Sequence, residues 1–112
     1  MTFEEFWQKG IDLLRTKISD PGGNKIVIDN WRADRGLSGQ RFPLVKASDG
    51  GIKCLSIHAS KEINIPKEDM EVLYGMWGDY LSGEVNRMDI IDSIPRPAYC
   101  LSLMKYLKDN VS

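Results

Sequence analysis

The sequence predicts an α+β domain: an N-terminal helix, a small antiparallel three-stranded sheet with a hairpin, and three C-terminal helices. Apolar residues recur at helical spacing towards both ends of the chain, and β-branched runs fill its middle. An Asp-Gly pair, typical of hairpin turns, separates two of these runs. The chain has 112 residues, a usual size for one domain. We therefore expect residues 1–112 to form a single domain with element order α-β-β-β-α-α-α.

The first helix is expected to begin after Thr2. The Thr2 hydroxyl can accept a hydrogen bond from the Glu5 amide while the Glu5 carboxylate accepts one from Thr2, which is a capping box. The turn-forming residues 20–24 should end the helix, because Pro21 cannot continue its hydrogen-bond ladder. The face predicted to be buried consists of Phe3, Phe6, Trp7, Ile11, Leu14 and Ile18.

Short β-branched and apolar runs predict the strands of the sheet. The predicted strands are residues 25–29, 42–47 and 52–58. Residues 32–41 have no steady period and are predicted to form a loop, whereas residues 63–65 are interpreted either as a further strand or as the approach to a helix. Asp49-Gly50 favours a type I′ turn, in which both central residues have positive φ. A two-residue turn would place Lys46 opposite Lys53, so a longer turn that avoids this repulsion is the alternative.

Three helices are predicted for the last part of the chain. They are residues 66–82, 87–92 and 97–109. Pro66 and Pro97 suit the first position of a helix, where no amide hydrogen is needed. Gly83 suits a helix end, and Asn86 can cap the short middle helix.

Charge is segregated along the chain although the net charge is only −1. Residues 24–61 carry seven Lys and Arg against three Asp, whereas residues 62–112 carry five against nine acidic residues. A strong generic nucleic-acid binder is therefore not expected, but a local basic surface is. No apolar run approaches the roughly 20 residues of a membrane span. The acidic start does not resemble a signal peptide, so no membrane association and a cytoplasmic location are expected.

The sequence offers little for catalysis or metal binding. His58 is the single histidine, and Cys54 lies about 13 Å from it along a predicted strand. No metal-ligand spacing and no phosphate loop occur, so we expect no metal, no cofactor and no enzymatic activity, with a small hydrolase or nuclease as the minor alternative. Cys54 and Cys100 lie in apolar stretches and are expected to be buried free thiols.

A basic stretch with aromatic residues is the first candidate site. Arginine holds phosphate or carboxylate through paired hydrogen bonds, and exposed aromatic rings stack on bases. The alternative is a solvated loop whose aromatic residues are buried. The residues predicted to bind nucleic acid or an acidic protein are Trp31, Arg32, Arg35, Arg41 and Lys46.

The three C-terminal helices resemble a helix-turn-helix, which gives a second candidate site. In that arrangement the last helix would be a recognition helix with the residues Arg96, Tyr99, Ser102 and Lys105 on or near its outer face. The proline-stiffened turn before this helix and the balanced charge of residues 83–112 depart from the motif. Plain packing of three helices around a core is the alternative.

Two glycines inside the predicted helix 66–82 suggest an alternative function. Gly75 and Gly78 cost helix stability, up to about 1 kcal/mol each. They would be favoured where another backbone approaches closely, either the first helix or a second subunit. Together with Tyr74 they predict a homodimer, a protein–protein interaction module with no nucleic-acid role.

Overall fold

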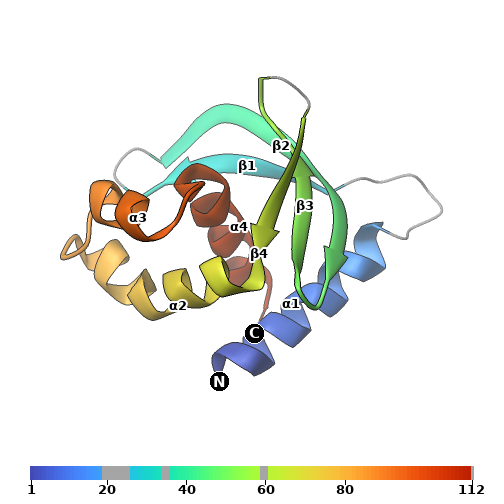
Figure 1. Ribbon diagram of the computed structural model, residues 1–112, viewed down its shortest axis with the longest axis horizontal. Coiled ribbons are helices and arrows are strands. Elements are labelled where there is room, and N and C mark those ends of the chain that lie inside the picture. The colour runs from blue at the N-terminus through green and yellow to red at the C-terminus, as the bar shows by residue number, and fades with distance from the viewer. Residues whose placement is uncertain (19–25, 34–35, 59–60, 112) are drawn as a thin grey trace.

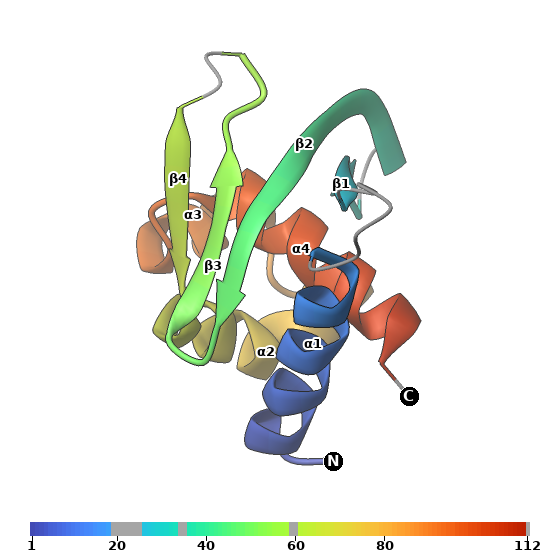
Figure 2. The same cartoon turned by 90° about the vertical axis from the view of Figure 1, so that its right-hand side faces the viewer.

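The computed structural model describes residues 1–18, 26–33, 36–58 and 61–111. One antiparallel sheet, in the strand order β1-β2-β3-β4, has helices packed against one face (Figures 1 and 2). The elements are α1 Phe3–Ile18, β1 Val27–Arg32, β2 Gly36–Ser48, β3 Gly51–Leu55, β4 Glu62–Pro66, α2 Lys67–Ser82, α3 Arg87–Ser93 and α4 Pro97–Asn110. The α+β class is confirmed, as are the N-terminal helix and the three C-terminal ones.

The predicted count of three strands is wrong, because the sheet has four. Residues 62–66 form β4, so the strand interpretation of residues 63–65 is confirmed. Residues 36–41, predicted to be a loop, form the first part of β2 and pair with β1. Their side chains from Leu37 onwards are all exposed. A strand without a buried face has no alternation of apolar and polar residues, so the sequence carried no period to detect.

β2 is long because its two parts pair with different strands. Its first part pairs with β1, as in Ile28 opposite Phe42, and its last part pairs with β3, as in Leu44 opposite Cys54. Pro43 lies at the change of partner. It stands opposite Val27 in β1, while the hydrogen bond runs from the neighbouring Leu44 amide to the Ile26 carbonyl at 2.9 Å. A residue without an amide hydrogen is tolerated at this position because its nitrogen does not face β1.

The hairpin between β2 and β3 has the tight connection considered above. Ser48 stands opposite Gly51, so the turn has two residues and the longer alternative is wrong. Gly50 does not have a positive φ, which means that the turn is not of type I′. Gly51 is required for another reason: a Cβ there would lie 2.7 Å from the Ile65 carbonyl oxygen of β4.

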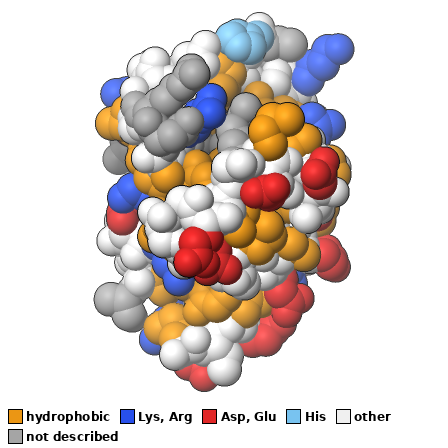
Figure 3. Space-filling view, turned by 90° about the vertical axis from the view of Figure 1, so that its left-hand side faces the viewer, with side chains coloured by type: hydrophobic (Ala, Val, Ile, Leu, Met, Phe, Trp, Pro, Cys, Tyr) orange, Lys and Arg blue, Asp and Glu red, His pale blue; other side chains and the backbone are white. Residues whose placement is uncertain are grey.

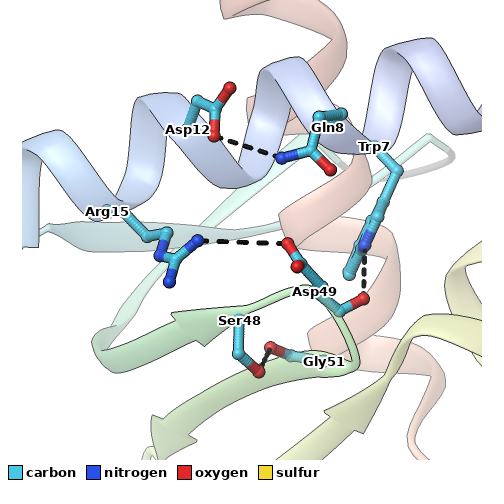
Figure 4. Close-up of polar contacts among 7 residues, drawn as sticks. All are labelled: Trp7, Gln8, Asp12, Arg15, Ser48, Asp49 and Gly51. Atoms are coloured by element: carbon cyan, nitrogen blue, oxygen red, sulfur yellow. Dashed lines mark hydrogen bonds and ion pairs between the residues drawn. The ribbon is translucent and has the colours of Figure 1, made fainter.

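Helix α1 holds the tip of this hairpin (Figure 4). The buried Trp7 indole donates a hydrogen bond to the Asp49 carbonyl at 2.9 Å. The Asp49 carboxylate lies 3.9 Å from the Arg15 guanidinium. Both contacts fix the turn against the helical layer.

Side chains of α2 and α4 hold β1 and the residues that follow β1 and β3 by accepting hydrogen bonds from backbone amides. The pairs are the Tyr80 hydroxyl with the Ala33 amide at 2.9 Å, the Tyr99 hydroxyl with the Ile57 amide at 3.1 Å, and the Ser102 hydroxyl with the Trp31 amide at 3.0 Å. A polar group removed from water must be paired to avoid a desolvation penalty. These contacts therefore fix how the helices sit on the sheet.

The predicted helix ends largely agree with the structure. Asn86 and Asp89 form a reciprocal capping box at the start of α3, and Gly83 ends α2 with a φ of 88°. Pro66 is the residue before α2 rather than its first residue. The predicted end of the first helix at residues 20–24 lies outside the described residues. No helix in the described part of the chain is long and apolar enough to cross a membrane.

Candidate functional site

A β-bulge in β2 turns a lysine to the outer face of the sheet, opposite the helical layer. The register between β2 and β3 shifts between Leu44 and Lys46. In a regular strand Lys46 would point to the same face as the buried Leu44. Because of the bulge, Val45 and Lys46 are both exposed, and Ala47 is buried in place of Lys46.

The strand register gives a row of polar side chains across three strands. Lys46 of β2 stands directly opposite Lys53 of β3, and Lys53 stands opposite Asn64 of β4. All three residues are exposed. The ion pairs found within the described ranges involve neither lysine. Two like charges directly opposite each other destabilise a sheet, so this pair lowers the stability of the free protein.

The row borders a hollow of about 300 Å³ at the hairpin end of the sheet. The rest of its lining consists of Ser48, Gly50, Gly51, Ile52 and Pro66. The Ser48 hydroxyl donates to the Gly51 carbonyl at 3.1 Å (Figure 4). The carboxylate nearest to the turn, that of Asp49, is directed to Arg15 on α1. The hollow therefore has a positive rim, where ammonium and amide groups can donate hydrogen bonds to an anion.

The cysteines do not supply a nucleophile to this site. Cys54 and Cys100 are buried and free, which confirms the prediction. Burial raises the pKa of the Cys54 thiol to about 11, against an opposing effect of the Arg96 charge. The thiolate is the reactive form of cysteine, so this thiol is unreactive at neutral pH.

The predicted arginine stretch is only partly brought together. Arg41 forms an ion pair with Asp29 at 2.9 Å, and both side chains are more than half exposed. Arg32 is half-buried, and Arg35 lies outside the described residues. Trp31 packs against the aromatic rings of α2 rather than standing free: its ring lies 5.8 Å from that of Trp77. Of the four predicted residues that the structure describes, Lys46 alone borders the hollow.

The predicted recognition helix is largely a core helix. Ser102 is 1 % exposed, so its predicted place on the outer face of α4 is wrong. Tyr99 packs edge-on against the buried Phe42, with ring centres 5.0 Å apart. Lys105 forms an ion pair within the helix to Asp109, and Arg96 is exposed at the start of α4. Contacts between α4 and β1 explain why this face is buried.

The predicted close approach at the two glycines of α2 is wrong for the described chain. A Cβ built on Gly75 or Gly78 would meet no atom within 4 Å. Tyr74 is occupied within the molecule, where its hydroxyl donates to the Met1 carbonyl at 3.1 Å. Figure 3 shows hydrophobic side chains among acidic ones on the α2–α3 side. The exposed apolar residues of these helices are Val72, Leu81, Met88 and Ile91. A homodimer stays a prediction.

Neither a metal-ligand cluster among the described residues nor a similar protein indicates a function for this chain. Within residues 1–18, 26–33, 36–58 and 61–111, no cluster of His, Cys, Asp and Glu side chains could hold a metal ion. Comparison with protein-family models, with curated proteins and with solved structures found no match.

Proposed function

We propose that the protein binds nucleic acid through the phosphate backbone, using the outer face of the sheet around Lys46 and Lys53. The observation that carries the proposal is the uncompensated pair itself. A bulge directs Lys46 away from the core, and the register then places it opposite a second lysine. Local features that lower stability without a structural benefit are expected at functional sites. A phosphate between the two ammonium groups would remove their repulsion.

The surroundings favour a polyanion over a small anion. The hollow is open and is bordered by the exposed Asn64, and Arg41 is exposed farther along β2. The basic residues 24–61 and the acidic residues 62–112 would also orient an approaching polyanion towards the sheet. We propose binding without catalysis, as an accessory protein. Arg32 and Arg41 are proposed to extend the contact along β1 and β2, and Arg35, outside the described residues, is proposed to add to it.

Binding to a DNA duplex should be weak and dependent on salt. Two neutralised phosphates give a slope of about −2 for the logarithm of affinity against the logarithm of salt concentration. This slope is measured by fluorescence anisotropy with a labelled duplex of about 20 base pairs at several salt concentrations. Replacing both lysines, Lys46→Gln and Lys53→Gln, should remove most of this slope and lower the affinity about tenfold.

The matched control removes the same charge from the helical layer. Lys9→Gln with Lys17→Gln on the exposed side of α1 should leave most of the affinity and slope. If both pairs of substitutions have equal effects, binding depends on net charge only and the proposed site is wrong. The triple variant Arg32→Ala, Arg35→Ala and Arg41→Ala shows whether the contact extends along β1 and β2.

Repulsion between Lys46 and Lys53 should also be detectable in the stability of the free protein. Lys53→Gln should raise the free energy of unfolding by about 0.2–1 kcal/mol, because it removes repulsion from Lys46. Urea denaturation at low salt measures the change. Lys61→Gln serves as the control, since Lys61 is exposed and precedes β4 without a lysine opposite. Equal changes in the two variants would show that the pair is not strained.

A further inference from the structure

A second hollow, of about 450 Å³, lies between β1 and α4. β1 contributes Val27, Asp29 and Trp31 to it, and α4 contributes Ser102, Lys105 and Asp109. It shares no residue with the hollow that contains Lys46 and Lys53. A hollow of this volume is within the usual range for ligand sites, about 300–1,000 Å³.

One wall of this hollow is an unpaired strand edge. Among the described residues, β1 is the first strand of the sheet and pairs with β2 alone. The Ile26 carbonyl accepts from β2, and backbone groups alternate in direction along a strand. The amide and carbonyl groups of Val27 and Asp29 therefore point away from β2. In the described part of the chain, no hydrogen bond to these outward groups is found.

Helix α4 covers part of this edge and leaves another part accessible. At Trp31 the helix closes the edge, because the Ser102 hydroxyl accepts the hydrogen bond of the Trp31 amide at 3.0 Å. Towards Val27 the strand and the helix enclose the hollow instead. The hollow therefore leaves room beside the strand only where α4 does not contact its edge. Addition of a strand satisfies exposed edge groups and is a common mode of peptide recognition.

The lining indicates which side chains an added strand would carry. Two carboxylates border the hollow: Asp29, which is also paired with Arg41, and Asp109, which is also paired with Lys105. Both carboxylates are more than half exposed and can accept further hydrogen bonds. The rings of Trp31 and Tyr106 offer an apolar wall. Side chains of an added strand point alternately to the two faces of the sheet.

We propose that the hollow between β1 and α4 binds an extended peptide as a fifth strand, with basic side chains alternating with apolar ones. The basic side chains would lie on the outer face beside Asp29. The apolar ones would lie against Trp31 and Tyr106. The two hollows share no residue, although Asp29 of this one is paired with Arg41 of the proposed nucleic-acid contact.

The probe is the blocked pentapeptide acetyl-Val-Lys-Val-Lys-Val-amide, titrated into isotopically labelled protein. Binding should shift the amide resonances of Val27 and Asp29 and slow their hydrogen exchange at least about fivefold, since each gains a hydrogen bond. Two further peptides carry N-methyl groups on the Val residues or on the Lys residues. Only one set of amides faces β1, so one methylated peptide should bind like the parent and the other at least about tenfold more weakly.

Variants of the protein separate this site from the other. Asp109→Asn should weaken binding of the lysine peptide about three- to tenfold at low salt, while Lys46→Gln with Lys53→Gln should leave it unchanged. Three results would overturn the proposal: no binding at about 1 mM peptide, equal loss with both methylated peptides, or shifts confined to the Lys46–Lys53 hollow. Binding of indole or phenol there without the pentapeptide would show a small-molecule pocket instead.

Discussion

Raising the pH from about 9 to about 11 should lower the free energy of unfolding by about 2–4 kcal/mol through the two buried thiols. Burial raises the pKa of Cys100 to about 12, and the nearby charges of Asp69 and ionised Cys54 raise it further in the same direction. Burial likewise raises the pKa of Cys54 to about 11. Both thiols have an ordinary value of 9.0.

The direction follows from which state holds the protons. Above pH 9 the thiols of the unfolded chain ionise, while those of the folded protein stay protonated up to about pH 11 or 12. The unfolded state then binds fewer protons, so stability falls as pH rises. Below pH 9 both states are protonated and the thiols contribute no pH dependence.

The measurement compares urea unfolding at several alkaline pH values for the wild type and for Cys54→Ala with Cys100→Ala. The variant has a lower stability because it loses buried volume, but its stability should fall less steeply with pH. Tyr and Lys side chains titrate in both proteins, so the difference in slope isolates the thiols. Parallel slopes would contradict the burial of these groups. A thiol reagent should label neither cysteine in the native protein.

The helices could be predicted from the sequence because their signals are local. The apolar face of α1 and the capping box at Asn86 each lie within a few turns of chain. In the same way, Gly83 predicts the C-terminal end of α2, and Pro97 predicts the beginning of α4. A helix closes its own hydrogen bonds, so its residues report its presence without knowledge of distant partners.

The sheet was harder to predict because its hydrogen bonds join distant residues. β2 is paired along its exposed first part only because β1 lies beside it. Two tertiary conditions accompany the bulge at Val45: Ala47 is buried in the core, and Trp7 holds the tip of the hairpin. Neither condition can be predicted from the residues next to Lys46 in the sequence.

The candidate site shows the same limit. Lys46 was predicted for its charge, whereas Lys53 and Asn64 were missed because only the register brings them beside it. The sequence did contain a signal. A tight Asp49-Gly50 turn implies that two lysines face each other, and this was interpreted as an objection to the tight turn. The structure has the tight turn and the repulsion together.

Ser102→Ala should lower the free energy of unfolding by about 1–3 kcal/mol, because it leaves the Trp31 amide without a partner. Ser102 is buried, and its hydroxyl oxygen accepts from that amide at 3.0 Å. The single hydroxyl hydrogen donates to the Ala98 carbonyl at 2.8 Å, with the Asn30 side-chain oxygen at 3.2 Å as the other acceptor. The residue thereby joins α4 to the bulge of β1 beside Asn30. Ser102→Val should cost about 1–3 kcal/mol more, since it adds volume to a packed site.

Two controls separate this contact from a surface role. Ser82→Ala removes an exposed hydroxyl that donates to the Asp79 carbonyl near the end of α2, and it should change stability by no more than about 0.5 kcal/mol. Hydrogen exchange at the Trp31 amide should become faster in Ser102→Ala and stay unchanged in Ser82→Ala. A helix that presented Ser102 to DNA would give the opposite result: unchanged stability and exchange, with weaker duplex binding. The burial of Ser102 therefore predicts loss of stability first, and any loss of DNA binding should follow only from unfolding.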